Sequence, residues 1–580
     1  MSNSKDSQHM EKAQNWLEGN YDEDTKKEVK RLMDEDPEAL ADAFYKDLEF
    51  GTGGLRGIMG VGTNRMNKYT VGSATQGLAN YLKKNFKDKK PVKVAIAYDS
   101  RLNNTYFAKI TADVLSANGI KVYVFDDIRP TPELSFAIRT LKCQSGIVIT
   151  ASHNPKEYNG YKVYWEDGAQ LVGPHDKNVI EEVKKVNNVE DINFNGKPEL
   201  QETIGEDIDR QYIDRIRGLS LNPEIVIKQK DIKIVYTPLH GTGVELVPRA
   251  LKSMGFENVM NIPEQDVKDG NFPTVKSPNP EEPAALDMAI KKAREQDAEL
   301  VMATDPDADR VGVAVKDSTG EFKLLNGNQT AALLIQYIIS QWEKRGLIKG
   351  QEYIVKTIVT SEILKDIANN HGVESYDTLT GFKYIAEVIR EMEDKKTFIA
   401  GGEESYGYLA GDFVRDKDAV ISACLIAEAT AYAKENGMSL LQQLHEIHLQ
   451  YGFYKEGLKS VVKKGKAGAE EINDMMEKFR NDPPDTINNS KIIRARDYSK
   501  GIELSMDTGN EYQIYFPKSN VLQFFTEDGT KITMRPSGTE PKIKFYIGVK
   551  QDIYENDDYQ ETAKKLEERI NSVIKDLGVE

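Results

Sequence analysis

The hydrophobic positions of the chain fall into short apolar runs separated by longer amphipathic stretches. Residues 92–98, 121–125 and 146–149 are rich in β-branched side chains and are bounded by turn formers, a pattern that predicts buried strands. Helix-like spacing from 108 to 118 separates the first two runs. Strands and helices that alternate in this way predict right-handed crossovers and a parallel or mixed sheet.

The same pattern restarts twice further along the chain. Strands are predicted at 232–236, 299–304 and 311–315, with helical spacing between the first two. A long apolar helix at 330–342 then opens a third stretch, which contains a strand at 397–400. The repetition predicts three similar α/β units with mixed sheets.

The two ends of the chain differ from these units. Residues up to about Leu48 have apolar positions at helix-like spacing and predict helices laid against the first unit. Ile543 and Phe545 begin a strict alternation of apolar and polar residues, as in a sheet with one buried face, and a helical pattern at 557–574 closes the chain. This predicts a C-terminal α+β domain. The predicted domain boundaries are 1–205, which includes the N-terminal helices, 206–324, 325–455 and 456–580.

The composition is that of a soluble globular protein and narrows the range of partners. The 580 residues are 39% hydrophobic and 29% charged, with a formal net charge of −16. Nucleic acids and anionic lipids bind preferentially to basic surfaces, and this chain is acidic, so neither is an expected partner. Cys143 and Cys424 form no disulfide framework or zinc pattern, and we expect buried free thiols. Without a signal region or an apolar span of roughly 18 residues, we expect a cytoplasmic protein.

A polar turn at 150–155 follows the third apolar run and contains Ser152. The carboxyl end of a strand is where α/β proteins keep their sites, so we interpret Ser152 as the reacting group of an enzyme. The alternative is an ordinary surface turn, because Ser, Asn and Pro are common turn formers. A serine hydrolase is disfavoured, because Ser152 lacks a Gly-x-Ser-x-Gly elbow and the adjacent His153 is expected to point away from it.

The strand at 299–304 delivers a run of alternating carboxylates, Asp305, Asp307 and Asp309. In an extended loop such residues face the same side and can surround a hard divalent cation, which prefers oxygen ligands. A calcium EF-hand is excluded, because Arg310 and Lys316 stand where Gly and Glu are required. The alternative is a solvated acidic turn. With few protein ligands, the ion would keep open positions, as Mg²⁺ does when it binds a phosphate.

Three further loops carry polar groups beside glycines. The glycine-rich stretch at 51–57 contains Arg56, which adds a positive charge where backbone amides can approach a ligand, although such a loop is often a tight turn. Glu403 and Ser405 can bind sugar hydroxyls, and a helix N-cap explains them equally well. Residues 535–539 combine an arginine, two hydroxyls and a glycine, which suits a phosphate, with a plain turn as the alternative.

In their order along the chain, the loops at 150–155, 305–310, 402–407 and 535–541 resemble the four signature loops of the α-D-phosphohexomutase superfamily. The similarity is greatest to the phosphoglucomutase branch of the bacillus and eukaryotic type-two kind, and it extends over nearly the whole chain. It implies four domains around a central cleft. In chain order these would hold the phosphoserine loop, the metal, the sugar and the substrate phosphate.

The resemblance also implies roles for individual residues. Ser152 would be phosphorylated in the resting enzyme and would complete a Mg²⁺ site formed with Asp305, Asp307 and Asp309. Lys162 would carry protons. The remaining implied positions are Arg56, His153 and Lys417 lining the site, Thr380, Gly381, Lys383, Glu403 and Ser405 at the sugar, and Arg535, Ser537, Gly538 and Thr539 at the phosphate, with Lys544 as a helper.

The implied reaction interconverts glucose 1-phosphate and glucose 6-phosphate, with glucose 1,6-bisphosphate as intermediate and activator. Phosphoryl transfer is catalysed mainly by positioning and electrostatics, which matches a metal with several cationic side chains. The branch also includes phosphopentomutases, so pentose or mannose phosphates stay open as substrates. A non-catalytic sugar-phosphate binding protein is a remote alternative, since no motif is broken. A monomer and a dimer are both compatible with the sequence.

Overall fold

The computed structural model describes residues 3–51, 53–317, 319–463, 465–538 and 541–579. The chain packs into two compact units. Unit 1 contains the residues up to 327 together with 382–400 and 405–437, and unit 2 contains 328–381, 401–404 and the residues from 438 onward.

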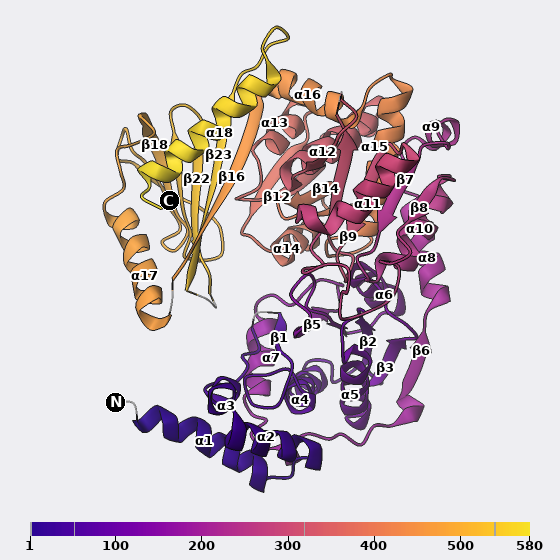
Figure 1. Cartoon of the computed structure of the whole chain (residues 1–580), viewed down its shortest axis with the longest axis vertical. Helices are drawn as coiled ribbons and strands as arrows, with labels where there is room; N and C mark the ends of the chain where they lie inside the picture. The colour runs from indigo at the N-terminus through magenta and orange to yellow at the C-terminus, as the bar shows by residue number, and fades with distance from the viewer. Residues whose placement is uncertain (1–2, 52, 318, 464, 539–540, 580) are drawn as a thin grey trace. The chain divides into compact units, whose positions relative to one another are not determined.

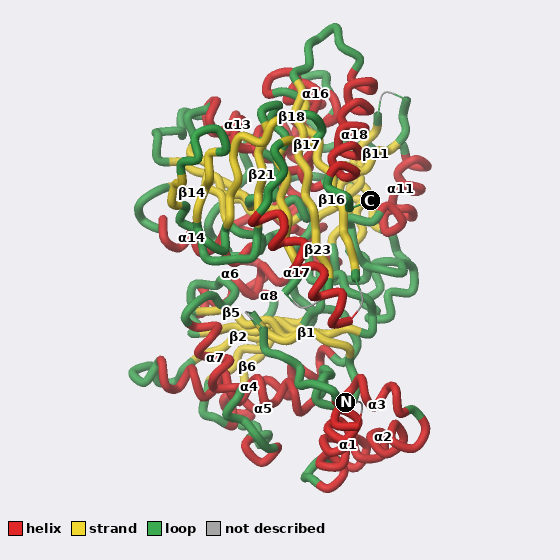
Figure 2. The backbone as a smooth tube through the Cα atoms, turned by 90° about the vertical axis from the view of Figure 1, so that its left-hand side faces the viewer, coloured by secondary structure: helices red, strands yellow, loops and turns green. Residues whose placement is uncertain are grey.

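The first sheet of unit 1 is mixed and carries the predicted serine turn. Its elements are β1 Gly54–Ile58, α4 Lys68–Asn85, β2 Lys93–Tyr98, α5 Asn104–Ala117, β3 Lys121–Phe125, α6 Thr131–Leu141, β4 Ser145–Ile149, β5 Tyr158–Trp165, α7 His175–Val183, the 3₁₀ turns Val189–Asp191 and Pro198–Leu200, and β6 Gln201–Ile204. The strand order is β1-β5-β4-β2-β3-β6, with β1, β5 and β4 antiparallel and the others parallel. Helices α4, α5 and α7 lie on one face and α6 on the other (Figure 2).

Strand β4 shows why this sheet forms. Ile147, Val148 and Ile149 are fully buried, because helices cover both faces of the strand. Each such side chain contributes about 1.5–3 kcal/mol by leaving water. The continuous apolar run therefore fixes the strand, and the first polar residues after it begin the turn at its carboxyl end.

The N-terminal helices pack against the first sheet's helix α4. They are α1 Asn3–Glu18, α2 Glu23–Glu35 and α3 Pro37–Phe44. The ring of Trp16 stacks on Tyr21 at 4.4 Å and meets the edges of Phe44 and Tyr69 at 5.4 and 5.6 Å. Since Tyr69 lies on α4, this aromatic cluster attaches the helices to unit 1.

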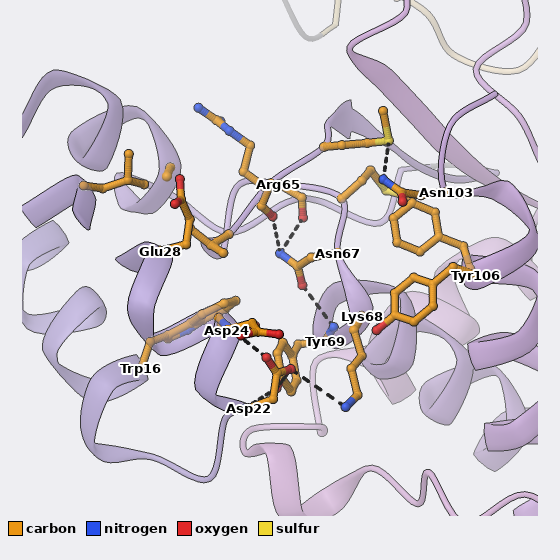
Figure 3. Close-up of a pocket in the computed structure, with 18 of the residues that line it drawn as sticks. Trp16, Asp22, Asp24, Glu28, Arg65, Asn67, Lys68, Tyr69, Asn103 and Tyr106 are labelled. Carbon is orange, nitrogen blue, oxygen red and sulfur yellow. Dashed lines mark hydrogen bonds and ion pairs between the residues drawn. The ribbon is translucent and has the colours of Figure 1, made fainter. Parts of the chain in front are cut away.

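A cavity of about 760 Å³ lies between these helices and the starts of α4 and α5 (Figure 3). The polar groups on its wall pair with one another. Tyr69 donates its hydroxyl hydrogen to Asp22 at 2.7 Å, and Lys68 lies 3.9 Å from the same carboxylate. Arg65 donates to the carbonyls of Asp42 and Asn64 at 3.2 and 3.1 Å, so it ties the loop after β1 to α3.

The second sheet, also in unit 1, carries the aspartate run. Its elements are α8 Glu206–Arg217, α9 Pro223–Lys228, β7 Ile234–Thr237, α10 Gly243–Met254, β8 Val259–Asn261, α11 Pro283–Gln296, β9 Leu300–Thr304, β10 Val311–Lys316 and β11 Phe322–Leu325. The order β11-β10-β9-β7-β8 combines parallel and antiparallel pairs. Strand β9 is buried along its whole length and ends directly before Asp305.

The following elements alternate in the same way. They are α12 Gly327–Lys344, β12 Glu352–Thr357, α13 Ile363–Asn370, β13 Glu374–Thr378, α14 Phe382–Met392, β14 Thr397–Glu403, β15 Gly407–Ala410, α15 Ala419–Glu435 and α16 Leu440–Tyr451. In unit 2, β12 and β13 pair in parallel. In unit 1, the apolar helix α15 is buried almost throughout.

The C-terminal part of unit 2 is a large antiparallel sheet. Its elements are β16 Phe453–Val462, α17 Gly465–Asn481, β17 Thr486–Ile487, β18 Ser490–Asp497, β19 Ile502–Ser505, β20 Glu511–Gln513, β21 Leu522–Thr526, β22 Lys531–Pro536, β23 Lys542–Gln551 and α18 Tyr559–Asp576. The order is β16-β23-β22-β21-β18-β19-β20, with β17 paired to β18. Helix α18 packs across β16 and β23 (Figure 1). Ile543, Phe545, Ile547 and Val549 are buried, as their alternation predicts.

The predicted fold class, three α/β units with mixed sheets and a C-terminal α+β domain, is confirmed. Most predicted strands and helices occur within a few residues of their expected positions, and 121–125 matches β3 residue for residue. Within the described part of the chain, no helix combines the length and apolar character needed to span a bilayer.

Candidate active site

The turn after β4 places Ser152 beside a carboxylate of the second sheet. Its Oγ donates a hydrogen bond to Asp305 Oδ2 at 2.7 Å, and its side chain is only 4% exposed. The backbone of Ser152 is left-handed, with a φ of 52°. A non-glycine residue in this region costs on the order of 1–3 kcal/mol, and such strain is found most often at functional sites.

His153 lies on the same side as Ser152, which corrects the expectation that it points away. Its Nδ1 is 3.1 Å from Ser152 Oγ, because the left-handed backbone at Ser152 turns the chain at this residue. Burial, and then the charges of Arg310 and Arg56, lower the pKa of His153 to about 3. The imidazole is therefore neutral near pH 7 and can exchange a hydrogen bond with the Ser152 hydroxyl.

The three aspartates converge because the chain turns, not because it is extended as predicted. Residues 305–310 form a tight turn in which Ala308 has a φ of 48°. One oxygen of Asp305 accepts hydrogen bonds from the amides of Asp309 and Arg310, at 3.1 and 3.0 Å. This local pairing closes the turn and brings the carboxylates together.

The convergence of Asp305, Asp307 and Asp309 fits a divalent cation. Each offers an oxygen within 4.8 Å of the others, and all three side chains are buried. The Oδ1 atoms of Asp307 and Asp309 are buried without a hydrogen-bond partner among the described residues. Buried carboxylates with unused oxygens strongly favour a hard cation, for which oxygen is the preferred ligand.

Two lysines from different segments balance part of this negative charge. Lys162 on β5 lies 2.8 Å from Asp307 and 3.8 Å from Asp309. Lys417 lies 3.0 Å from Asp309, and its side chain packs against Gly407, where a Cβ would come within 2.1 Å of it. A glycine is therefore required at this position for Lys417 to reach the aspartates.

The surrounding charges shift the pKa values of Asp305 and Asp307 in opposite directions. Burial raises the pKa of Asp305 well above its ordinary value, and the charges of Asp307 and Asp309 raise it further. Burial acts in the same direction on Asp307, yet its pKa is lowered, because the ammonium groups of Lys162 and Lys417 favour the ionised form. The site therefore holds a carboxylate that stays charged next to one that readily takes a proton or a metal.

Residues 305–310 form the candidate metal-binding turn, called the metal turn below, and three of its neighbours were not identified from the sequence. Gly241 lets the loop after β7 touch the turn, since a Cβ there would lie 2.4 Å from Cα of Pro306. Thr131, at the start of α6, donates through its amide to the carbonyl of Asp307 at 2.9 Å and through its hydroxyl to the carboxylate at 3.0 Å. Asp416 precedes Lys417 in the sequence, and its carboxylate lies 3.0 Å from the Lys417 ammonium group. The same carboxylate accepts a hydrogen bond from the hydroxyl of Tyr164 at 2.6 Å, and this pairing keeps the lysine in place.

The other predicted members of the site in unit 1 lie on nearby elements. Arg56 is exposed on β1, opposite Gly160 of β5, and donates to Asn154 of the serine turn at 3.3 Å. Ser405 lies in the turn between β14 and β15. The carbonyl of the next residue, Tyr406, accepts a hydrogen bond from the amide of Val311 at 3.1 Å, directly after the metal turn. Lys383 lies near the start of α14, where burial lowers its pKa.

In unit 2, the predicted sugar groups meet at the end of β14. Glu403 accepts a hydrogen bond from the amide of Gly381 at 2.9 Å, and Thr380 directly precedes this glycine. The sequence Gly-Glu-Glu-Ser therefore belongs to a strand and a turn, and the alternative of a helix N-cap is wrong. The backbone contact orients the Glu403 carboxylate and joins two segments that are far apart in the sequence.

The predicted phosphate loop begins on β22 of unit 2. Arg535 stands directly opposite Lys544 of β23 in the antiparallel register. Like charges in such a pair repel each other, so an anion bound between them would stabilise the strand pair. The amide of Ser537 donates to the carbonyl of Lys542 at 2.7 Å, and Gly538 follows. Thr539 lies outside the described residues.

Comparison with known proteins covers most of the chain. Models of three consecutive α/β/α domains, I, II and III of phosphoglucomutase/phosphomannomutase, match residues 47–190, 210–320 and 326–451. A phosphoglucomutase of Staphylococcus haemolyticus is 41% identical over 516 residues, 88% of this chain and 92% of that protein. A phosphoglucomutase of Staphylococcus aureus is 39% identical over 92% of this chain and 94% of its own length.

Solved structures share the fold at lower sequence identity. The open form of parafusin, a Paramecium phosphoglucomutase, has a TM-score of 0.69 at 18% identity and covers 92% of this chain and 95% of its own. A putative phosphomannomutase of Thermus thermophilus has a TM-score of 0.66 at 21% identity, over 92% of this chain and 98% of its own. These likenesses support the architecture described above.

If the aspartate turn binds a divalent metal, removing one of its carboxylates should weaken that binding. D309N keeps the side-chain shape but replaces a carboxylate by a neutral amide. It should weaken Mn²⁺ binding, measured by calorimetry or electron paramagnetic resonance, by more than the roughly 10- to 100-fold that loss of an outer-sphere partner costs. D297N, at an exposed carboxylate after α11, is the matched control. Wild-type Mn²⁺ affinity in D309N would contradict the metal assignment.

Proposed function

The chain belongs to the phosphoglucomutase/phosphomannomutase family, and we propose that it interconverts glucose 1-phosphate and glucose 6-phosphate through a phosphorylated Ser152. Relatives named phosphoglucomutase at about 40% identity make it a phosphoglucomutase-type isomerase. The proposal adds the sugar, the intermediate and the role of each residue.

The observation that carries the proposal is the position of the Ser152 hydroxyl. It lies 2.7 Å from Asp305, inside a cluster of three buried carboxylates and two lysines. A phosphoryl group on this oxygen would stand between the metal-binding turn and the ammonium groups. Such an arrangement supplies the positive charge that phosphoryl transfer needs at its charge-spread transition state.

We propose Mg²⁺ as the ion of the aspartate turn. Asp305, Asp307 and Asp309 would hold it, and an oxygen of phosphorylated Ser152 would complete the site. When bound, the ion would offset the negative charge of the transferring phosphoryl group. The residues around it would do the rest: Lys162 and Lys417 add positive charge, and Thr131 and Asp416 keep Asp307 and Lys417 in place.

The reaction we propose has two half-reactions that balance. A free sugar hydroxyl attacks the phosphorus of phosphorylated Ser152, the bond from phosphorus to Ser152 Oγ breaks, and glucose 1,6-bisphosphate forms. Lys162 is the proposed proton carrier: it gives a proton to Ser152 Oγ as the bond to phosphorus breaks and receives the proton of the sugar hydroxyl. After the bisphosphate has turned over, the Ser152 hydroxyl attacks the other phosphate, and the proton returns to the sugar oxygen.

A bisphosphate that reacts in two orientations needs separate binding groups for its sugar and for the phosphate that is not reacting. Glu403, held by the amide of Gly381, is the proposed acceptor for sugar hydroxyls. Thr380, Lys383 and Ser405 are assigned to the same role. For the phosphate we propose Arg535, Ser537, Gly538 and Thr539, with Lys544 as a helper because it is the cross-strand partner of Arg535. Arg56, His153 and Lys417 would line the reacting phosphate.

Replacing Ser152 tests the proposal directly. S152A should lower the rate of glucose 1-phosphate conversion at least about a thousandfold, as loss of a covalent nucleophile does. The assay couples formation of glucose 6-phosphate to a dehydrogenase, in the presence of a trace of glucose 1,6-bisphosphate. S253A, which changes a serine on α10 whose hydroxyl donates to the helix carbonyl of Ala250 at 2.8 Å, is the control. Wild-type turnover by S152A would rule out Ser152 as the nucleophile.

A second candidate function is phosphomannomutase activity, which the name of the matching family includes. Phosphopentomutase activity on the same scaffold is a third possibility in the same class. The values of kcat/KM for glucose, mannose and pentose 1-phosphates decide between them. We expect the value for glucose 1-phosphate to be the highest, and a higher value for either other sugar would change the substrate assignment.

A further inference from the structure

We infer that Arg101 is a positioning residue for Ser152, and that its guanidinium holds the serine turn in the conformation from which phosphoryl transfer proceeds. The inference rests on the proposed function, because it concerns the rate at which Ser152 gives and takes a phosphoryl group. Arg101 follows the carboxyl end of β2, the strand beside β4, and is only 3% exposed.

The two terminal nitrogens of the Arg101 guanidinium are directed at one turn. One terminal nitrogen donates to the carbonyls of Pro155 and Tyr158, at 2.9 and 3.0 Å. The other donates to the carbonyl of Ser152 at 2.6 Å and to that of Asn154. Four backbone carbonyls between 152 and 158 thus converge on a single side chain, which a flat, forked group can satisfy.

The amide side of Ser152 is fixed by a second route from the same strand end. The amide of Ser152 donates to the hydroxyl of Thr150 at 2.8 Å, and this hydroxyl donates to Asp99 at 2.5 Å. Asp99 is 1% exposed and also accepts from the amide of Arg101 at 2.8 Å. Both peptide groups of Ser152 are therefore tied to Asp99 and Arg101.

These ties oppose the strain at Ser152. Its φ of 52° is unfavourable for a residue with a side chain, so an unrestrained turn would relax away from it. Relaxation would carry Oγ off its line to Asp305, from which it is now 2.7 Å. We call the hydrogen bonds from Arg101, Thr150 and Asp99 to the serine turn the clamp. Because a misplacement of about 1 Å can cost on the order of 100-fold in rate, loss of the clamp should slow the chemical step.

The sugar and distal phosphate groups are on other segments. Beyond the serine turn, Arg101 lies beside Asp99, whose Oδ2 is 3.5 Å from its Nε, and beside the ring of Phe272, 5.1 Å from the guanidinium carbon. Loss of the clamp should therefore lower kcat and leave the binding of the sugar phosphate almost unchanged. A merely structural arginine would instead lower activity only in proportion to the folded fraction.

R101K tests the inference, because lysine keeps the charge but cannot fork to four carbonyls. We expect kcat to fall about 100-fold while KM stays within about threefold. With excess glucose 1,6-bisphosphate, intact mass should show Ser152 being phosphorylated more slowly but reaching the wild-type end point. T150V, which removes only the hydroxyl between Ser152 and Asp99, should show the same split with a smaller loss and serves if R101K does not fold.

R65K is the matched control, because Arg65 also donates to backbone carbonyls in unit 1, but to those of Asp42 and Asn64, outside the serine turn. It should keep wild-type kcat with a similar change in melting temperature. Unchanged kcat in R101K, a rise of KM alone, or a loss equal to that in folded fraction would overturn the inference. Failure of the proposed function would show separately, as a wild-type enzyme that turns over no sugar phosphate.

Discussion

The mutual repulsion of three buried carboxylates governs how the charged groups of the candidate site in unit 1 are arranged. Asp305, Asp307 and Asp309 lie in one turn, each with an oxygen within 4.8 Å of the others, and all three are buried. Such an arrangement is unstable unless cations join it. Lys162 and Lys417 provide two, and the unused aspartate oxygens leave a place for a third, the metal. The same charges make the Ser152 oxygen a suitable place for a phosphoryl group.

The α/β architecture brings these charges together from distant parts of the chain. Strands β4 and β9 are fully buried, and each ends directly before a polar turn, so the turns occupy fixed places at sheet edges. Neighbouring segments then hold the aspartate turn: Thr131 at the start of α6 donates to Asp307, and Gly241 in the loop after β7 allows close contact with Pro306. Rigid strand ends allow a strained residue such as Ser152 to persist, because the surrounding structure determines its conformation.

The sequence predicts those features that local chemistry controls. Continuous apolar runs define β4 and β9 closely, since a strand buried on both faces needs such a run. The convergence of the aspartates was also predictable, because three like charges between two apolar strands need a cation. Residue types and spacing thus suffice for the metal turn and for the serine turn, whose roles in catalysis stay predictions.

Backbone conformation and long-range pairing were beyond the reach of the sequence. The metal turn was predicted to be extended, whereas Ala308 adopts a left-handed conformation that its residue type disfavours. The orientation of His153 was wrong for the same reason, because it follows from the φ of Ser152. Thr131 bonds Asp307 across 176 positions, a separation at which no local pattern indicates a partner. These are tertiary effects that override propensity.

In the proposed mechanism, Ser152 carries the phosphoryl group that the sugar receives. The most direct measurement incubates the protein with labelled glucose 1,6-bisphosphate, locates the phosphate by tandem mass spectrometry of peptides, and then adds unlabelled glucose 6-phosphate. We expect a single phosphate on Ser152 that is lost to the sugar as labelled bisphosphate at the rate of turnover. A phosphate on another residue, or one on Ser152 that the sugar does not remove, would contradict it.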